Sequence, residues 1–195
     1  MKPFIPALVL FFLACSISVN AQSLDGKPYT PGVDPDIDLY LSSWQHSMPR
    51  RIHGSLIVRD ILTKGDPMHP TRKGAVLKYF NNFSHATLTA GSSTPVSKLD
   101  GEQEMIYILS GRGSIQTESG PSYDLYPGIA VLIPDGLEFT MTSSGDEALT
   151  MYLVNEPVPE GFRPNTELMI RDENTTPISS TDVHWAHIWK GLFFT

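Results

Sequence analysis

The sequence predicts an all-β protein in which short strands close into a barrel or a sandwich. Short apolar runs recur about every 8–12 residues between residues 55 and 154. Turn residues bound these runs: Pro127-Gly128 and Pro134-Asp135-Gly136 flank Ile129–Ile133, which has the length and composition of a buried strand. The segments between the runs show almost no helical period, which also favours a closed barrel or a sandwich.

Length and composition fit one barrel of ordinary size with extensions at both ends. The chain has 195 residues, of which 41% are hydrophobic, a normal share for a globular domain. Its formal net charge of -7 argues against a nucleic-acid partner. The acidic residues are scattered along the chain, which indicates a solvated surface rather than an acidic tail.

Residues 1–21 are predicted to be a secretory signal peptide. Lys2 supplies a basic start, Phe4–Ala14 is an apolar core, and Val19-Asn20-Ala21 offers small residues before a cleavage site. The apolar run is too short to span a membrane. We therefore expect a protein without a membrane span that begins near Gln22 and is secreted or periplasmic.

The single cysteine, Cys15, allows a second interpretation of this leader. Cleavage after Ala21 would remove Cys15 and leave a mature protein that cannot form a disulfide. In the alternative, Phe12–Cys15 is a lipoprotein box and the protein is anchored through a lipid on Cys15. Such boxes prefer an aliphatic residue where Phe12 stands.

Residues 22–54 are predicted to form an extended arm, because three prolines and several small polar residues within residues 22–43 interrupt any regular element there. A disordered leader is the alternative. Ser55–Leu62, rich in Leu, Ile and Val, is expected to be the first strand. Thr63–Gly74 contains two glycines and two prolines and is expected to be a loop.

Two hairpins are expected inside the barrel. Ala75–Phe80 and Phe83–Ala90 would be joined at Asn81-Asn82, a dipeptide that tolerates left-handed backbone conformations. Ser110–Gly113 similarly separates Met105–Leu109 from another short strand, with glycines where φ is expected to be positive.

Glu138–Ser143 alternates between apolar and polar residues, which predicts a strand with Phe139 and Met141 on the interior face. Ala148–Val154 is the last predicted barrel strand. The barrel is therefore expected to cover residues 55–156.

Residues 157–195 are expected to be a C-terminal connector, because prolines and polar residues replace the strand pattern. Val183–Trp189 looks like an opening strand, so the chain is interpreted as ending at the start of a second barrel. The alternative is a tail that folds back onto its own barrel or onto a sister subunit.

The spacing of glycines and prolines in this barrel resembles the two signature motifs of the cupin family. In the first motif, Gly91, Glu104 and Gly111 stand at the family's positions. The two histidine slots of that motif hold Ser97 and Leu99 instead.

The second cupin motif is matched in the same partial way. Gly128, Pro134 and Gly136 stand in the required order, but the histidine slot holds Phe139 and the final asparagine slot holds Ser143. The resemblance implies a cupin jelly-roll β-barrel, here with an N-terminal arm and a C-terminal extension.

The resemblance also implies a divalent metal held by three imidazoles and one carboxylate, a set suited to Fe, Mn, Ni, Cu or Zn. Ser97, Leu99 and Phe139 cannot replace those nitrogens, so we expect a barrel without a metal cofactor. The alternatives are a divalent transition metal bound by other ligands, or a hard cation held by Asp100 and Glu104 in a shifted register.

Glu104 is the family ligand that remains, and strand parity places it on the same face as Ile106 and Ile108. At an apolar barrel mouth it is a candidate general acid or base. The alternative is a structural carboxylate paired with Lys98, Arg112 or a backbone donor.

His85 is the one histidine within a predicted barrel strand, on the face of Thr87 and Thr89. We expect it either to point into the pocket or to be a hydrogen-bonded histidine without a metal. His46, His53 and His69 precede the barrel motifs and are not assigned to the site. The predicted pocket residues are Glu104, Ser97, Leu99, Phe139, His85 and Met141.

Two functional hypotheses follow. In the first, the barrel is non-catalytic and either binds a small polar organic molecule or supports a partner barrel. In the second, it is a cupin enzyme of the isomerase, dioxygenase or aminohydrolase type that uses Glu104 or unrecognised metal ligands. The resemblance further implies a homodimer formed by packing of β-sheets.

Overall fold

The computed structural model describes residues 37–118 and 120–177. All elements described below lie within residues 37–177. The predicted signal peptide and the segment Val183–Trp189 lie outside the described residues. No helix in the described part of the chain is long and apolar enough to cross a membrane.

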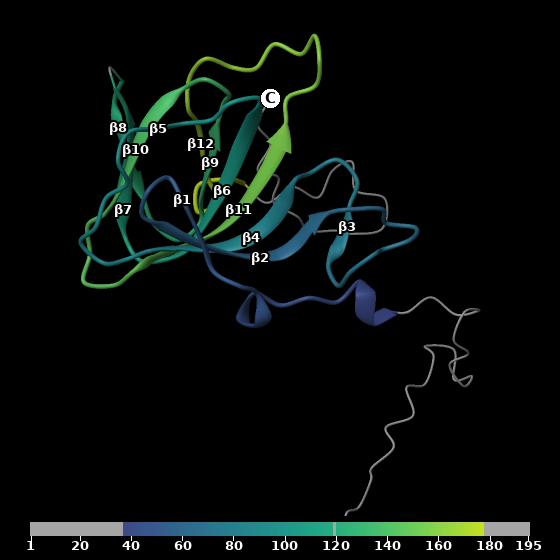
Figure 1. Cartoon of the computed structure of the whole chain (residues 1–195). Coiled ribbons are helices and arrows are strands. Elements are labelled where there is room, and N and C mark those ends of the chain that lie inside the picture. The colour runs from purple at the N-terminus through teal and green to yellow at the C-terminus, as the bar shows by residue number, and fades with distance from the viewer. Residues whose placement is uncertain (1–36, 119, 178–195) are drawn as a thin grey trace, which may run out of the picture. The chain divides into compact units, whose positions relative to one another are not determined.

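The described strands form two sheets that face each other across an apolar interior, as expected for an all-β jelly roll (Figure 1). In the larger sheet the strands are ordered β1-β2-β4-β11-β6-β9-β12, and β3 pairs with the C-terminal end of β2. Its members are β1 (Arg50–Ile52), β2 (Leu56–Lys64), β3 (Ala75–Leu77), β4 (Asn82–Leu88), β6 (Glu102–Ser110), β9 (Ile129–Ile133), β11 (Leu149–Pro157) and β12 (Met169–Asp172).

The smaller sheet is ordered β5-β10-β7-β8. Its members are β5 (Ser97–Lys98), β7 (Gly113–Thr117), β8 (Ser122–Leu125) and β10 (Glu138–Ser143). Two short 3-10 helices, η1 (Ile37–Leu39) and η2 (Trp44–His46), precede β1.

The core forms because alternate residues of both sheets point inward. In β10, Phe139 and Met141 are buried while Thr140 and Thr142 are half-buried, which confirms the predicted parity. All five residues of Ile129–Ile133 are buried, as expected for a continuous apolar run. The fold class predicted from the sequence is confirmed.

Both predicted hairpins are wrong, because the two strands of each predicted hairpin do not pair with each other. β3 is parallel to β2, and β4 pairs with β2 and β11, so Asn81-Asn82 does not join two paired strands. β6 pairs with β11 and β9, whereas β7 pairs with β10 and β8. Gly111, with a φ of 82°, thus marks a crossing from one sheet to the other, where a Cβ would lie 2.5 Å from the Ala148 carbonyl oxygen.

A hairpin that the sequence interpretation did not anticipate joins β1 to β2. His53 and Gly54 have φ values of 44° and 72°, so two consecutive residues adopt the left-handed conformation that a tight hairpin turn requires. β1 lies within the predicted arm at residues 22–54, so the end of that range is part of the larger sheet.

The segment after the barrel returns to it. β12 pairs antiparallel with β9, and Leu168 joins the hydrophobic core. The Tyr126 hydroxyl donates to an Asp172 carboxylate oxygen at 2.8 Å, and the Tyr107 hydroxyl donates to Glu173. For these residues the tail therefore folds back onto its own barrel rather than opening a second one.

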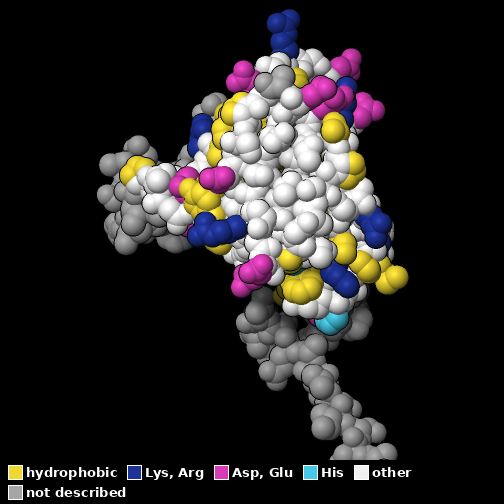
Figure 2. Space-filling model, turned by 90° about the vertical axis from the view of Figure 1, so that its left-hand side faces the viewer, with side chains coloured by type: hydrophobic (Ala, Val, Ile, Leu, Met, Phe, Trp, Pro, Cys, Tyr) yellow, Lys and Arg dark blue, Asp and Glu magenta, His cyan; other side chains and the backbone are white. Residues whose placement is uncertain are grey.

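The outer face of the smaller sheet is polar but carries few charges. Figure 2 shows this side of the molecule, with most Lys, Arg, Asp and Glu side chains near the margins of the view. The strands explain this composition, because β7 and β10 turn Ser114, Gln116, Thr140 and Thr142 away from the core.

Candidate functional site

Glu104 lies on the interior face of β6 and is completely buried. It shares that face with Ile106 and Ile108, as strand parity predicted. Asn155 of β11 stands opposite Glu104, and Asn82 of β4 stands opposite Asn155. One interior row across three strands is therefore polar, next to a core of apolar side chains.

His53 provides an imidazole partner for this buried carboxylate. Its Nε2 lies 3.2 Å from one Glu104 oxygen and 3.3 Å from the other, and its side chain is only 9% exposed. A positive φ is uncommon for a residue with a side chain, and residues held in this way cluster at functional sites. Gly54 packs against Pro95 so closely that a Cβ would lie 2.5 Å from Pro95 Cγ, so the turn has little freedom to move.

These contacts correct the sequence interpretation of the site. His53 is not separate from the barrel motifs, because the turn after β1 directs it to the carboxylate of β6. Lys98 and Arg112 are not the partners of Glu104, since Lys98 is an exposed residue of β5 and Arg112 lies at the crossing between the sheets.

Two asparagine amides extend the network toward solvent. Asn155 Nδ2 donates to Glu104 at 3.0 Å and to Glu102 at 3.3 Å. Asn81 Nδ2 donates to the other Glu102 oxygen at 3.0 Å. The carboxylates of Glu102 and Glu104 are thus linked through the shared amide of Asn155.

A second polar group adjoins the first on β2 and β4. Arg50 Nη2 donates to Asp60 at 2.9 Å, and Ser84 Oγ donates to the same carboxylate at 2.7 Å. Burial alone would raise the pKa of Asp60, but the hydrogen bonds from Arg50 and Ser84 and the Arg50 charge outweigh it and lower that pKa. Asn82 connects the groups, because its amide oxygen accepts the backbone N–H of Asn155 at 3.2 Å and its nitrogen lies 3.5 Å from Asp60.

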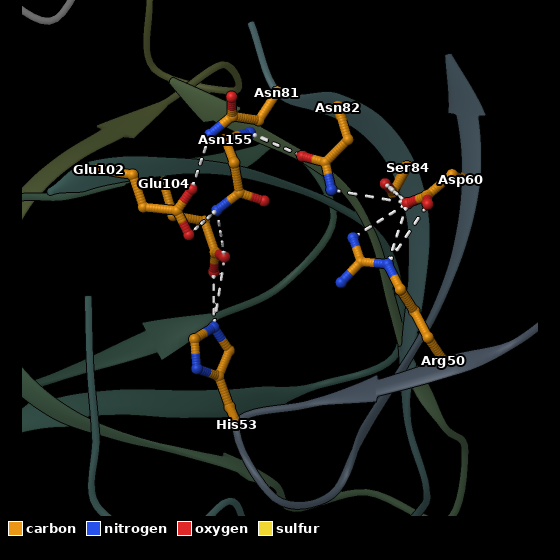
Figure 3. Close-up of polar contacts among 9 residues, drawn as sticks. All are labelled: Arg50, His53, Asp60, Asn81, Asn82, Ser84, Glu102, Glu104 and Asn155. Atoms are coloured by element: carbon orange, nitrogen blue, oxygen red, sulfur yellow. Dashed lines mark hydrogen bonds and ion pairs between the residues drawn. The ribbon is translucent and has the colours of Figure 1, made fainter. Parts of the chain in front are cut away.

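These side chains enclose a cavity of about 190 Å³ at one end of the barrel (Figure 3). Glu104 and His53 are its buried part, whereas Glu102, Asn81 and Arg50 are partly exposed and form its mouth. The lining residues are Arg50, Ile52, His53, Asn81, Asn82, Glu102, Glu104 and Asn155.

Three of the other predicted pocket residues are core residues. Phe139, Leu99 and Met141 are at most 4% exposed, and the Phe139 ring packs edge-on against His53 with a centroid distance of 5.0 Å. Ser97 is half-buried in β5 and donates its hydroxyl to the Pro95 carbonyl oxygen at 3.0 Å. Phe139 therefore adjoins the cavity, and Ser97 does not reach its polar groups.

His85 faces the outside of the larger sheet, not the pocket. β4 buries Ser84 and Ala86 and turns His85 outward, where its ring stacks on Trp44 at a centroid distance of 4.4 Å. Burial beneath Trp44 and the nearby Arg59 charge lower the pKa of His85. The expectation that His85 points into the pocket is wrong because the inward face of β4 is the one that carries Ala86 and Leu88.

Comparison with protein families identifies the barrel. The family described as "Cupin domain" matches residues 84–155, from β4 to β11. This range includes Glu104 and Asn155 but not His53. Residues 84–155 form a cupin domain. A search of curated proteins gives no match to the chain.

The chain is similar to several solved structures. A predicted oxalate decarboxylase from Thermotoga maritima is 22% identical with a TM-score of 0.48, covering 60% of this chain and 98% of that one. A bacterial pirin from Escherichia coli in complex with nickel(II) is 17% identical with a TM-score of 0.52, covering 68% and 57%. A putative glyoxylate induced protein from Pseudomonas aeruginosa is 10% identical with a TM-score of 0.53, covering 69% and 48%. The chain thus aligns with only about half of the last two proteins, and identities this low carry over the fold alone.

The metal set of the cupin family does not fit this cavity. Three of its four slots hold Ser97, Leu99 and Phe139, and the His53 ring contacts both Glu104 and Phe139, so it lies between two of the slots. Within residues 37–118 and 120–177, no three His, Cys, Asp or Glu side chains are grouped so that they could hold a metal ion. His53 and Glu104 supply two ligands, fewer than the three or four protein ligands of typical zinc sites.

The site residues missed by the sequence analysis share one property: each depends on strand register. Asn82 and Ser84 alternate with Phe83 and His85, and the apolar Ala86 that follows indicates which face is internal. That signal was sufficient to place Asn82 inside the barrel. The position of His53 had only a local signal, the His-Gly pair at a turn.

Proposed function

We propose that the cupin domain binds a small polar organic molecule in the cavity lined by His53 and Glu104, without a resident metal. The observation that carries the proposal is the buried His53–Glu104 pair at the inner end of a polar cavity. Burying a carboxylate is unfavourable unless it is paired and hydrogen-bonded, and Glu104 is the buried charged residue among the described residues of a mostly apolar core. Recognition of a ligand gives a reason for keeping the charge there.

The size of the cavity limits the ligand. A water molecule takes about 30 Å³ in the liquid, so 190 Å³ corresponds to about six waters. A compact metabolite fits this space, whereas drug-sized ligands occupy larger clefts, of about 300–1,000 Å³. The partly exposed mouth at Glu102 and Asn81 would admit such a compound.

The donor set supports a metal-independent site. Asn155 and His53 already contact the Glu104 carboxylate, and no third His, Cys, Asp or Glu of the described residues is grouped with His53 and Glu104 to complete a metal site. Elemental analysis of the purified protein tests this part of the proposal. We expect less than stoichiometric transition metal, and about one equivalent that is lost in Glu104→Gln would contradict it.

The binding proposal is tested by a thermal-shift screen of small cations, anions, sugars and neutral amides against the full chain. A true ligand should raise the Tm of the wild type and of Ser97→Ala, but not of His53→Phe or Glu104→Gln. Circular dichroism of each variant would show that the barrel is intact. The proposal fails if no compound stabilises the wild type, or if every hit stabilises the four proteins equally.

Proton transfer is a second candidate function, of the isomerase type. An imidazole oriented by a carboxylate is a recurring arrangement for a general acid or base, and here both groups adjoin the cavity. The test is incubation of each ligand found by the screen in D₂O, followed by NMR. Deuterium should enter an acidic C–H position in the presence of the wild type and not of His53→Phe, and no exchange for any bound ligand would leave a binding module.

The export of the protein is also proposed, on the grounds of the signal-like order of residues 1–21. The alternative anchor at Cys15 predicts a lipid-modified N-terminus. Both predict a location outside the cytoplasm, and the mass of the mature N-terminus separates them.

We further propose that the domain forms a homodimer through the outer face of the larger sheet. Ile57 is 39% exposed and Tyr152 is 36% exposed on that face, and Phe83 packs against Tyr152 with a centroid distance of 5.1 Å. The smaller sheet instead presents hydroxyl and amide groups (Figure 2). Light scattering should give a dimer for the wild type and a monomer for Ile57→Lys with Tyr152→Lys, and a monomeric wild type would refute the proposal.

A further inference from the structure

We propose that the ligand of this cavity is a small organic cation with several N–H donors, such as an alkylguanidinium. This inference rests on the proposed binding function and adds the chemical class of the ligand. Three features of the cavity support it: the orientation of its amides, an amide oxygen that can accept a hydrogen bond from a ligand, and the balance of its charges.

The amide orientations are determined by the carboxylates. Asn155 Nδ2 donates to both Glu104 and Glu102, and Asn81 Nδ2 donates to Glu102. Because only the nitrogen of an amide can donate, each amide oxygen must point away from the carboxylates. Figure 3 shows both oxygens directed away from the two glutamates.

One of these oxygens, that of Asn155, is an acceptor at the cavity. The Asn155 side chain belongs to a residue that is 6% exposed and lines the cavity. In the described part of the chain, no side-chain donor reaches its amide oxygen, although its nitrogen serves two carboxylates. This oxygen can accept a hydrogen bond from a ligand that enters the cavity.

The charges of the lining favour a cation. Arg50 directs its Nε and one terminal nitrogen to Asp60, so its charge is balanced within the protein. Glu102 and Glu104 therefore face the cavity, and their side-chain partners there are one imidazole, that of His53, and neutral amides. An anion would meet two carboxylates, whereas a cation would add charge-assisted hydrogen bonds to them.

A planar donor group matches this set best. Glu102 lies at the mouth, Glu104 lies at the buried end, and the Asn155 amide bridges them. A guanidinium group presents up to five N–H donors in one plane and pairs with carboxylates through two parallel bonds. It could donate hydrogen bonds to both carboxylates and to the Asn155 oxygen. It has no acceptor atom that would need a donor from the protein.

The test is a calorimetric titration of the full chain with methylguanidinium, methylurea and acetate. Methylguanidinium and methylurea are planar and nearly equal in size, so they differ in charge and in one NH2 donor group, which methylurea replaces with a carbonyl acceptor. We expect methylguanidinium to bind about tenfold more tightly than methylurea, because hydrogen bonds to charged groups are the stronger ones, and acetate to bind least. Glu102→Gln should remove most of this preference, while Glu147→Gln, at an exposed turn, should leave it unchanged.

The outcomes separate the inference from the proposed function. If methylurea or acetate binds as tightly as methylguanidinium, the cationic class is wrong and the binding cavity stands. If none of the three binds and the broader screen also yields no ligand, both are wrong. If methylguanidinium binds to Glu102→Gln and to His53→Phe as tightly as to the wild type, it binds elsewhere and the inference is overturned.

Discussion

Replacing His53 by Phe isolates the energetic role of the buried pair. Phenylalanine keeps an aromatic ring against Phe139 and keeps a Cβ at the left-handed position, so packing and backbone strain change little. The imidazole nitrogen that lies 3.2 Å from Glu104 is lost. The completely buried carboxylate would then retain one side-chain donor, Asn155.

The expected magnitude follows from this loss. A hydrogen bond to a charged group contributes about 1.5–3 kcal/mol, which sets the cost for a neutral imidazole. Removing one partner of a buried ion pair costs about 3–5 kcal/mol, which sets the cost for a charged one. In a protein of this size each kcal/mol lowers Tm by about 2–4 °C, so His53→Phe should lower Tm by at least about 3 °C.

A double-mutant cycle shows whether the cost comes from the pair itself. Glu104→Gln removes the carboxylate, so adding His53→Phe to it should cost much less than in the wild type, with a coupling energy above about 0.5 kcal/mol. Urea unfolding of the four proteins measures this coupling. His69→Phe is the control, because the His69 side chain is 87% exposed, and it should change little. Additive effects in the cycle would refute the claim that His53 and Glu104 form a stabilising pair.

Three further predictions concern the turns, the outer face and the leader. Gly128→Val should lower Tm more than Ser97→Ala, because Gly128 has a φ of 95° and such strain costs about 1–3 kcal/mol; equal melting temperatures would argue against it. Because the pKa of His85 is lowered from 6.5, the unfolded state binds more protons as pH falls through that value. Stability should therefore decline below this pH, and His85→Gln should reduce the decline in urea unfolding measured on both sides of it. Mass spectrometry of protein from the native host should find an N-terminus near Gln22, whereas an intact Met1 or a lipidated Cys15 would exclude cleavage after Ala21.

The strands and their faces could be predicted because both depend on local pattern. Alternation in Glu138–Ser143 placed Phe139 and Met141 inside, and parity placed Glu104 beside Ile106. These inferences need only the period of two residues that every strand has. Family spacing added the jelly roll, which no local pattern specifies.

The pairings could not be predicted in the same way. Asn81-Asn82 has the composition of a hairpin turn, yet β4 pairs with β2 and β11, because burial of its inward face decides the partner. The contact between His53 and Glu104 joins residues 51 positions apart. This contact depends on the direction of a turn and on the register of several strands. Neither can be predicted from the properties of single residues.

The return of β12 to the barrel has a consequence for the solubility of shorter versions of this protein. β9 consists of five buried apolar residues, and β12 occupies the edge of the sheet beside it. Without β12, the backbone N–H and C=O groups along that edge would be free to pair with another molecule, and exposed apolar edges are templates for aggregation. A chain that stops before Met169 should therefore self-associate rather than yield a smaller soluble barrel. The pairing of β12 with β9 therefore prevents association between molecules, in addition to stabilising the barrel of each molecule.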